Sequence, residues 1–578
     1  MLVCRPLEGM TDDIEFRNVS FRYEVSQAYA LQGIDLRVPV GQIVLITGPA
    51  GSGKTTLCSC INGLIPHYHE GELTGEVLVR GYNTRKTRIG GLSSLVGLVF
   101  QDPESQLVTA SVGDEVAFGP ENLGVPRQEI NQRVAAALDA TRLTGYDERD
   151  PHSLSGGEQQ ACVIASIYAM HPEIYVMDEP MANLDPVGRA QVLQLVVDVA
   201  KRRGKTLVVV EHALEEVLPL VDRVIVLYRG RIVREGSVEE VMAAGDLPEV
   251  FTRPAIVRLA ERVGIDGTIL KPEAFYSALR SRYELGTIQG DGSGSDPPIS
   301  TSSAIVIEGL SYSYDGRNAA LDGVDLRVAE GELVAILGRN GSGKTTLVRH
   351  VIGLLQAGSG RVTVLGKDVS VTPTHELARD VGFCFQNPNH QIVSFTVRDE
   401  MAFGLKAHEV DVSEHDQRIR EALATVGLLD SLEAEVFDLG KGQKQRLALA
   451  SVLTLRPRIL IIDEPTTGQD PQMALEIFDI IKRLNDAGAT ILIITHKIDY
   501  AAAYADRAVV MGFGQVSFDG SFHDLLGDIE LMRSNSLDLP DTTKLAVLLA
   551  KHGVPPWLST YAELEKAVDR LLEASRAH

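Results

Sequence analysis

The nine residues GPAGSGKTT, at positions 48–56, return as GRNGSGKTT at positions 338–346. Each stretch follows a short apolar run, IVLIT before the first and LVAIL before the second. Glycines at these spacings let the backbone turn tightly, so that successive N–H groups and the start of the next helix face a phosphate. The pattern predicts two phosphate-binding loops, each placed between a strand and a helix.

The lysine and threonine near the end of each loop complete the predicted site. We expect Lys54 and Lys344 to reach the β- and γ-phosphates, and Thr55 and Thr345 to place a hydroxyl on Mg²⁺. The predicted phosphate-binding residues are Gly48, Pro49, Ala50, Gly51, Ser52, Gly53, Lys54, Thr55 and Thr56 in the first loop and Gly338, Arg339, Asn340, Gly341, Ser342, Gly343, Lys344, Thr345 and Thr346 in the second. A nucleotide with β- and γ-phosphates is therefore the predicted ligand, and Mg²⁺ is the predicted cofactor.

Outward from the loops, the two halves of the 578-residue chain repeat one another, with an offset of about 285–290 residues. Short β-branched runs alternate with helical patterns in both halves, which predicts an α/β fold with a largely parallel sheet. The predicted segments are a first domain at 12–250, its helical extension at 251–285, a Gly/Ser-rich linker at 286–304, a second domain at 305–528 and a C-terminal helical extension at 529–578.

A pair of adjacent carboxylates follows an apolar run in each half, in VMDEP at 176–180 and IIDEP at 461–465. Such a pair at the end of a strand, after a phosphate-binding loop, is typical of a nucleotide hydrolase. We expect Asp178 and Asp463 to hold Mg²⁺ through water, and Glu179 and Glu464 to polarise the attacking water.

The sequence LSGGE at 154–158 resembles the LSGGQ signature of the ABC ATPase family. The resemblance implies two P-loop ABC ATPase cassettes, each with a RecA-like core, a helical subdomain and a small β subdomain. It further implies Gln101 and Gln386 as Q-loop residues on Mg²⁺. His212 and His496, which follow VVVE and LIIT, match the switch histidines on the γ-phosphate, although a lone histidine is more often structural.

Tyr23 and Tyr314 match the aromatic residue that stacks on adenine in this family, and the alternative for both is a core aromatic. In the family, two cassettes bind each ATP between the phosphate-binding loop of one and the signature of the other. The nucleotide-binding set implied for the signatures is Ser155, Gly156, Gly157 and Glu158 in the first cassette and Gly440, Lys441, Gly442 and Gln443 in the second. One chain could thus form both sites without an obligate homodimer.

The second signature reads LGKGQ and departs from the family pattern. Gly440 cannot donate the hydrogen bond that the family serine gives to the γ-phosphate, and Lys441 adds bulk and charge unless its ammonium replaces that contact. Loss of one charge-assisted hydrogen bond is worth about 1.5–3 kcal/mol. We therefore expect the first ATP site, which faces this signature, to hydrolyse more slowly than the second.

The segments after the Q-loop glutamines, 101–119 and 386–404, agree at 10 of 19 positions and share QxPxxQ, an acidic pair and AFG. They are similar to the ATPases of energy-coupling factor importers of vitamins, vitamin precursors or transition-metal ions. The implied partners are a transmembrane coupling protein and a small substrate-binding membrane protein. Asp114-Glu115 and Asp399-Glu400 are either acidic contacts for arginines of the coupling protein or solvated or capping pairs.

The formal net charge of −23 argues against nucleic acid as the main partner. No apolar run approaches the roughly 18 residues of a membrane span, and the five cysteines form no CxxC pair, which favours reduced thiols in the cytosol. We expect a peripheral protein on the cytoplasmic face of the plasma membrane. The alternatives are a soluble twin-cassette ATPase acting on ribosomes or translation and the fused ATPase of a sugar importer.

Overall fold

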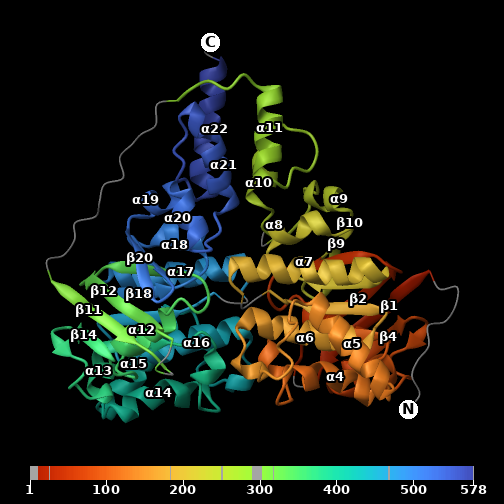
Figure 1. The fold of residues 1–578 in the computed structure, drawn as a ribbon, viewed down its shortest axis with the longest axis horizontal. Coiled ribbons are helices and arrows are strands. Elements are labelled where there is room, and N and C mark those ends of the chain that lie inside the picture. Colours follow the sequence, from red (N-terminus) through yellow and green to blue (C-terminus); the bar gives the residue numbers. More distant parts are fainter. Residues whose placement is uncertain are drawn as a thin grey trace. The chain divides into compact units, whose positions relative to one another are not determined.

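The computed structural model describes residues 11–24, 26–181, 184–248, 251–288, 302–314, 316, 318–466 and 469–576. The chain forms two compact units, Met1–Lys271 and Pro272–His578. Figure 1 shows the elements of both units. Most of the predicted linker, 286–304, lies outside the described residues.

The first unit contains two β-sheets, in the order β2-β1-β4-β5 and β10-β9-β3-β8-β7-β6. The four-stranded sheet is antiparallel, whereas the six-stranded sheet is parallel except for its edge strand β10. Its strands are β1 (Asp12–Tyr23), β2 (Leu31–Pro39), β3 (Ile43–Thr47), β4 (Gly71–Val79), β5 (Tyr82–Asn83), β6 (Val96–Val99), β7 (Ile174–Asp178), β8 (Thr206–Val210), β9 (Arg223–Tyr228) and β10 (Arg231–Gly236). Its helices are α1 (Lys54–Ile61), α2 (Leu64–His67), α3 (Ile89–Leu92), α4 (Val112–Asn122), α5 (Arg127–Ala140), α6 (Gly156–Met170), α7 (Pro186–Arg203), α8 (Leu214–Val217), α9 (Val238–Met242) and α10 (Ala255–Arg262).

The second unit repeats this topology, with sheets in the order β12-β11-β14-β15 and β16-β17-β18-β13-β19-β20. Its strands are β11 (Ser303–Tyr312), β12 (Leu321–Ala329), β13 (Leu333–Leu337), β14 (Ser359–Val364), β15 (Lys367–Asp368), β16 (Val381–Cys384), β17 (Ile459–Asp463), β18 (Thr490–Ile494), β19 (Arg507–Gly512) and β20 (Gln515–Gly520). Its helices are α11 (Pro272–Arg282), α12 (Lys344–Val351), α13 (Thr374–Asp380), α14 (Val397–Ala407), α15 (Val412–Thr425), α16 (Lys441–Leu453), α17 (Pro471–Asp486), α18 (Ile498–Tyr504), α19 (Phe522–Gly527), α20 (Ile529–Ser534), α21 (Asp541–Leu549) and α22 (Tyr561–Arg576).

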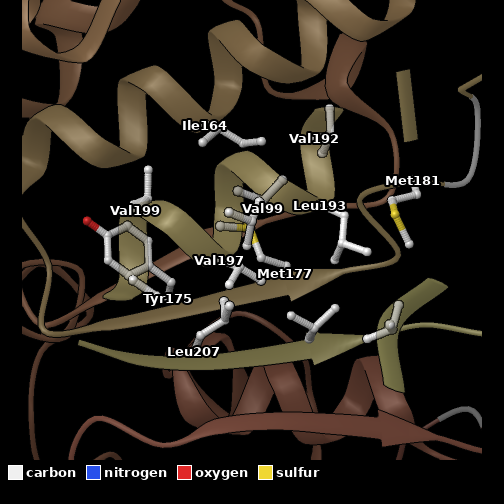
Figure 2. Close-up of a cluster of buried hydrophobic side chains, with 14 of the residues drawn as sticks. Val99, Ile164, Tyr175, Met177, Met181, Val192, Leu193, Val197, Val199 and Leu207 are labelled. Carbon is white, nitrogen blue, oxygen red and sulfur yellow. The ribbon is translucent and has the colours of Figure 1, made fainter. Parts of the chain in front are cut away.

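A hydrophobic core lies on each face of the parallel sheet. Alternate residues of β7 enter different cores, because successive side chains of a strand point to opposite faces. Tyr175 and Met177 pack with α6 and α7, as Figure 2 shows, whereas Ile174 and Val176 pack towards the four-stranded sheet. In both units, three helices pack on one another (α4–α6 and α14–α16) and form the predicted helical subdomain. The predicted α/β fold, with core, helical and β subdomains, is confirmed.

A buried charged network ties the two sheets of the first unit together. Asp13, at the start of β1, forms an ion pair with Arg80 at 2.5 Å and accepts a hydrogen bond from Thr206. Arg80 also pairs with Glu173 at 2.7 Å, and Glu173 pairs with Lys205 at 2.7 Å. The side chain of Asp13 is fully buried, and burial raises its pKa more than Thr206 and Arg80 lower it.

The second unit has no equivalent of this network among its described residues. Strand pairing places Ala304 and Leu365 where the first unit has Asp13 and Arg80, because Ile14 and Ile305 pair in the same register with the neighbouring strands. Leu365 donates its N–H to the Ala304 carbonyl at 2.8 Å, as Arg80 does to Asp13. An apolar pair therefore replaces a charged pair at the same place.

The helical segment after the first domain divides between the two units. The sequence predicts one extension at 251–285, but the boundary falls after Lys271, so that α10 belongs to the first unit and α11 to the second. Phe275 and Leu279 of α11 are fully buried, and α11 packs on α21 (Figure 1). The N–H of Ile288 donates to the His552 carbonyl at 2.9 Å. Burial of these apolar side chains outweighs sequence proximity to the first domain.

No helix within the described ranges is both long and apolar enough to cross a bilayer. Cys58, Cys60, Cys162 and Cys384 are free thiols and all are buried, while Cys4 lies outside the described residues.

Candidate functional site

Parallel strands deliver the predicted catalytic motifs to one edge of each sheet. In the first unit β8 lies between β3 and β7, and in the second β18 lies between β13 and β17. The phosphate-binding loop, the carboxylate pair and the switch histidine each follow the carboxyl end of one of these three strands. Ligand sites in parallel α/β sheets form at this edge.

Each phosphate-binding loop needs glycine at its first position. Gly48 and Gly338 have φ angles of 145° and 140°. A side chain at Gly48 would also collide with the carbonyl oxygen of Leu227, and one at Gly338 with that of Met511. The backbone can therefore approach β9 or β19 closely only because the side chain is missing.

The lysine side chains turn back into the loops. Lys54 donates to the carbonyls of Gly48 and Pro49 at 2.9 and 3.0 Å. Lys344 donates to the carbonyls of Gly338 and Arg339 at 2.6 and 2.9 Å. Each ammonium is thus held inside the curve of its loop, where an anion would be received.

Buried polar atoms face the same place. The hydroxyls of Ser52 and Ser342 and Oδ1 of Asp178 are buried and have no hydrogen-bond partner among the residues that the structure describes. Phosphate oxygens and a hydrated cation supply the acceptors and donors that such atoms need. The donor set therefore fits a nucleotide phosphate with Mg²⁺.

The first carboxylate of each pair sits at the base of the loop. Asp178 and Asp463 are 4% and 7% exposed, and Thr345 Oγ1 lies 3.5 Å from Asp463 Oδ2. Burial raises the pKa of each aspartate to about 6, although hydrogen bonds from Thr55 and Thr345 and nearby lysines act in the opposite direction. A divalent cation would favour the ionised form.

Ionising Asp463 should destabilise the nucleotide-free protein as the pH rises. Its pKa is about 6 when folded and 3.8 in the reference state, and one unit corresponds to 1.36 kcal/mol, so ionisation costs roughly 3 kcal/mol. The folded protein has its full stability below pH 4, where Asp463 is protonated, and loses this contribution as the pH rises to about 6. We expect Asp463→Asn to stabilise the protein by about 3 kcal/mol at pH 7.5 and by about half of that at pH 5.

Urea denaturation in EDTA at the two pH values checks this expectation. Asp430→Asn, at an exposed position, serves as the matched control and should show no such pH-dependent gain. An equal effect of Asp463→Asn at both pH values would contradict the buried ionisation.

The second carboxylate of each pair has an unusual backbone. Glu179 and Glu464 adopt left-handed φ angles of 50° and 47°, which non-glycine residues rarely take outside functional sites. Their N–H groups donate to the carbonyls of Val210 and Ile494 at 3.0 and 2.9 Å. This turn brings the carboxylates back over the ends of β8 and β18.

The switch histidines contact these glutamates. His212 Nε2 lies 3.0 Å from Glu179 Oε1, and His496 Nε2 lies 3.1 Å from Glu464 Oε1. His496 Nε2 also lies 3.1 Å from Asn340 Oδ1 in the loop. The structure thus brings together the predicted loop, carboxylate and histidine in each unit.

The Q-loop glutamines reach the same places. Gln101 donates from Nε2 to Glu179 Oε2 in the first unit. In the second, Gln386 lines a cavity of about 280 Å³ with Asp463, Glu464 and His496. The residues of the second loop from Asn340 to Thr346 also line this cavity, together with Tyr314, Ala320 and Ile494.

The predicted adenine-stacking tyrosines lie against the loops. Tyr23 Oη is 3.1 Å from Thr56 Oγ1, and Tyr314 Oη is 3.3 Å from Thr346 Oγ1. Tyr314 is 58% exposed, so it is not a core residue. Tyr23 packs edge-on against Phe21 with ring centroids 4.8 Å apart.

The two signatures begin α6 and α16 with different contacts. Glu158 accepts hydrogen bonds from the N–H and hydroxyl of Ser155 at 2.9 and 2.8 Å, and from the Tyr146 hydroxyl at 2.9 Å. Burial would raise the pKa of Glu158, but these hydrogen bonds lower it overall. In the second signature Gln443 accepts only the N–H of Gly440, at 3.0 Å, among the contacts described for it.

The two central glycine positions of LSGGQ, which Lys441 and Gly442 occupy in the second signature, are not equivalent. Lys441 is exposed at the first residue of α16, where a side chain finds room. Gly442 is buried, and a side chain there would collide with the end of Met473. Both departures from the family pattern, at Gly440 and Lys441, therefore fall on exposed positions.

The two acidic pairs after the Q-loops have structural roles. Glu115 is 4% exposed and accepts the N–H groups of Val108 and Thr109 at 3.0 and 2.9 Å. Glu400 is 3% exposed and binds its own loop in the same way. The interpretation of these glutamates as partner contacts is wrong, because both are buried. The exposed Asp114 and Asp399 lie in the first turns of α4 and α14, where their N–H groups donate to the capping hydroxyls of Ser111 and Thr396 and their carboxylates accept from the same hydroxyls.

Sequence reasoning missed several residues beside the site. Glu211, before the switch histidine, is buried, and Gln106 and Gln391 hold the Q-loop backbone through Phe100 N–H at 2.7 Å and Phe385 N–H at 3.1 Å. The two glutamines recur in QxPxxQ, which is the signal that could have identified them. For Glu211 the signal is the contrast of EH with TH in the two halves.

Comparison with known proteins identifies one family for both halves of the chain. The ABC transporter family model matches residues 31–182 and 321–467. A protein of Caldanaerobacter subterraneus subsp. tengcongensis, provisionally named an ABC transporter ATP-binding protein, is 37% identical over 93% of this chain and 96% of its own length. A similarly named protein of Methanosarcina acetivorans is 35% identical over 97% of this chain and 94% of its own length.

Among solved structures, cbiO1 of Clostridium perfringens, described as part of the ABC transporter complex cbiONQ, is 33% identical to this chain. The match covers 41% of this chain and 96% of that one, with a TM-score of 0.38.

Proposed function

The chain belongs to the ABC transporter family and is an ATPase with two cassettes, and on that premise we propose that it energises an energy-coupling factor importer. The proposed cargo is a vitamin, a vitamin precursor or a transition-metal ion. The observation that carries this proposal is the recurrence of QxPxxQ, an acidic pair and AFG after both Q-loop glutamines. The cargo would be recognised by another polypeptide.

We assign the same chemistry to each cassette. Glu179 and Glu464 would orient water in line with the γ-phosphate, and His212 and His496 would contact that phosphate. Thr55, Gln101 and Asp178 would hold Mg²⁺ in the first cassette, and Thr345, Gln386 and Asp463 in the second. When bound, Mg²⁺ neutralises charge on the β- and γ-phosphates.

The proposed ATP sites are composite, as the family resemblance implies. The signature with Ser155 and Gly156 would complete the site of Lys344, whereas the signature with Gly440 and Lys441 would complete the site of Lys54. The missing hydroxyl at Gly440 supports unequal sites, the first being slower. Closure of the cassettes on ATP and their release after hydrolysis would drive the membrane partners.

Exposed apolar side chains support a protein partner on both cassettes. The AFG phenylalanines, Phe118 and Phe403, are 48% and 56% exposed. Val108 and Val393, at matching positions of the Q-loop segments, are 64% and 63% exposed. The proposed occupant of these surfaces is the transmembrane coupling protein, which would hold the chain peripherally at the cytoplasmic face of the plasma membrane.

Purification from native membranes tests the importer assignment. We expect a tagged chain, extracted in mild detergent, to bring down one polytopic coupling protein and at least one small membrane protein. Phe118→Asp with Phe403→Asp should abolish this recovery without lowering the melting temperature. Recovery of ribosomes, or of no membrane protein, would leave the ATPase in place and overturn the importer role.

A further inference from the structure

Glu211 follows β8 directly, before the switch histidine, and its side chain is only 4% exposed. Its Oε1 accepts the N–H of Met181 at 3.1 Å, and its Oε2 accepts the N–H of His212 at 3.2 Å. Met181 lies two residues after Glu179. One carboxyl group therefore joins the main chain after β7 to the main chain after β8.

The second cassette arranges the same positions differently. Thr495 replaces the glutamate, and its hydroxyl accepts the N–H of Lys497 at 3.0 Å. The N–H of His496 lies 3.4 Å from Oε2 of Glu464. The catalytic carboxylate of the second cassette thus accepts the main-chain N–H of its own switch histidine.

In the first cassette that main-chain N–H goes to Glu211 instead. Glu179 Oε2 accepts from Gln101, and Glu179 Oε1 lies 3.0 Å from His212 Nε2. Both oxygens of Glu179 are therefore engaged by side chains of the Q-loop and of the switch histidine.

The two cassettes also differ at the residue two positions after the catalytic glutamate, which is Met181 in the first and Thr466 in the second. Met181 packs its side chain into the hydrophobic core and is 2% exposed (Figure 2), whereas the second cassette has Thr466 at this position. A main-chain N–H next to an apolar core needs an acceptor, because leaving it without one costs about 1–3 kcal/mol. Glu211 supplies that acceptor for Met181.

We propose that Glu211 is a positioning residue of the first ATP site, which holds the main chain at Met181 and His212 and so leaves Glu179 to Gln101 and the His212 imidazole. The proposal rests on the catalytic roles assigned above to Glu179 and His212. In this arrangement Glu211 acts through the main chain of Met181 and His212.

The electrostatics of the pocket agree with this role. Burial raises the pKa of Glu211 to about 8, and the charge of Glu179 adds to the effect. Both carboxyl oxygens of Glu211 accept a main-chain N–H, so glutamine, which has the same length but a single acceptor oxygen, can keep only one of the two contacts.

Single-turnover ATP hydrolysis by the full chain in a Glu464→Gln background tests the proposal at the first site. We expect Glu211→Thr, the residue of the second cassette, to lower the rate at least tenfold, about 1.4 kcal/mol, while the half-saturating ATP concentration stays within about twofold. Threonine is too short to reach Met181, so the His212 main chain turns to Glu179. Glu211→Gln should lower the rate less, by about threefold, because its one carbonyl oxygen can still accept one of the two N–H groups.

Glu179→Gln in the same background separates the possible failures. An unchanged rate in Glu211→Thr, beside a rate abolished by Glu179→Gln, overturns the positioning role alone. A rate insensitive to Glu179→Gln overturns both the role of Glu179 and the inference built on it. Equal losses in Glu211→Thr and Glu211→Gln, with the same drop in melting temperature, assign Glu211 to folding and also overturn the proposal.

Discussion

Glu464→Gln is expected to lower steady-state ATP turnover about ten- to a hundredfold, whereas Glu179→Gln should lower it less than about twofold. The reason is that the proposed first site faces Gly440, which lacks a hydroxyl for the γ-phosphate. That loss of about 1.5–3 kcal/mol leaves the first site with about 1–10% of the total rate. Turnover at saturating ATP and Mg²⁺ measures both variants.

Restoring the signature provides the matched control. In the Glu464→Gln background, Gly440→Ser with Lys441→Gly should raise turnover at least about tenfold, because it rebuilds LSGGQ opposite the first loop. ATP affinity should stay the same in Glu179→Gln and Glu464→Gln, since neither glutamate is placed to bind the ground state. Equal loss in Glu464→Gln and Glu179→Gln would contradict unequal, independent sites.

The second large effect concerns folding of the first unit. Arg80→Leu should destabilise it by about 3–5 kcal/mol, because Asp13 is left buried and without its ion-pair partner. Adding Asp13→Ala should recover most of that loss, since the second unit carries Ala304 and Leu365 at the same places. Hydrogen exchange of β1 and β4 during urea unfolding measures the stability of the first unit separately from that of the second.

A surface pair offers the control for this prediction. Arg458 and Glu330 of the second unit lie 3.0 Å apart with side chains 57% and 39% exposed, so Arg458→Leu should cost less than about 1 kcal/mol. Trp557, the only tryptophan, lies in the second unit. The urea midpoint of its fluorescence change should therefore be the same in Arg80→Leu as in the unchanged protein. A double variant no more stable than Arg80→Leu would contradict the explanation.

The sequence was sufficient to predict the motifs because each carries its own local signal. GxxxxGK[ST], the strand-ending DE pair and the strand-ending histidine depend on short spacings, and the structure brings them together in both units. The boundary of α11 could not be predicted in this way. Its burial depends on contact with α21, which lies more than 200 residues further along the chain, and no local pattern records such a partner.

The sequence also does not show whether an acidic residue is exposed for a partner or buried against its own loop. Glu115 and Glu400 look like exposed acids in the sequence, yet each folds back on its own Q-loop segment. The left-handed backbone of Glu179 and Glu464 is equally invisible, because glutamate has no local preference for it. Glu211 could have been noticed only by asking what a buried acid would bind.

The packing of α11 on α21 holds the end of the first cassette's chain to the second unit without a covalent bond, in addition to the peptide linker. A cut at Gly290 would leave α11 on the amino-terminal fragment, while α21, on which α11 packs, would remain on the carboxyl-terminal fragment. The fragments would then meet as subunits, with a peptide tail of one docked on the other. A split gene encoding the two halves could thus yield a heterodimer, and fusion mainly raises the effective concentration of an association that α11 already encodes.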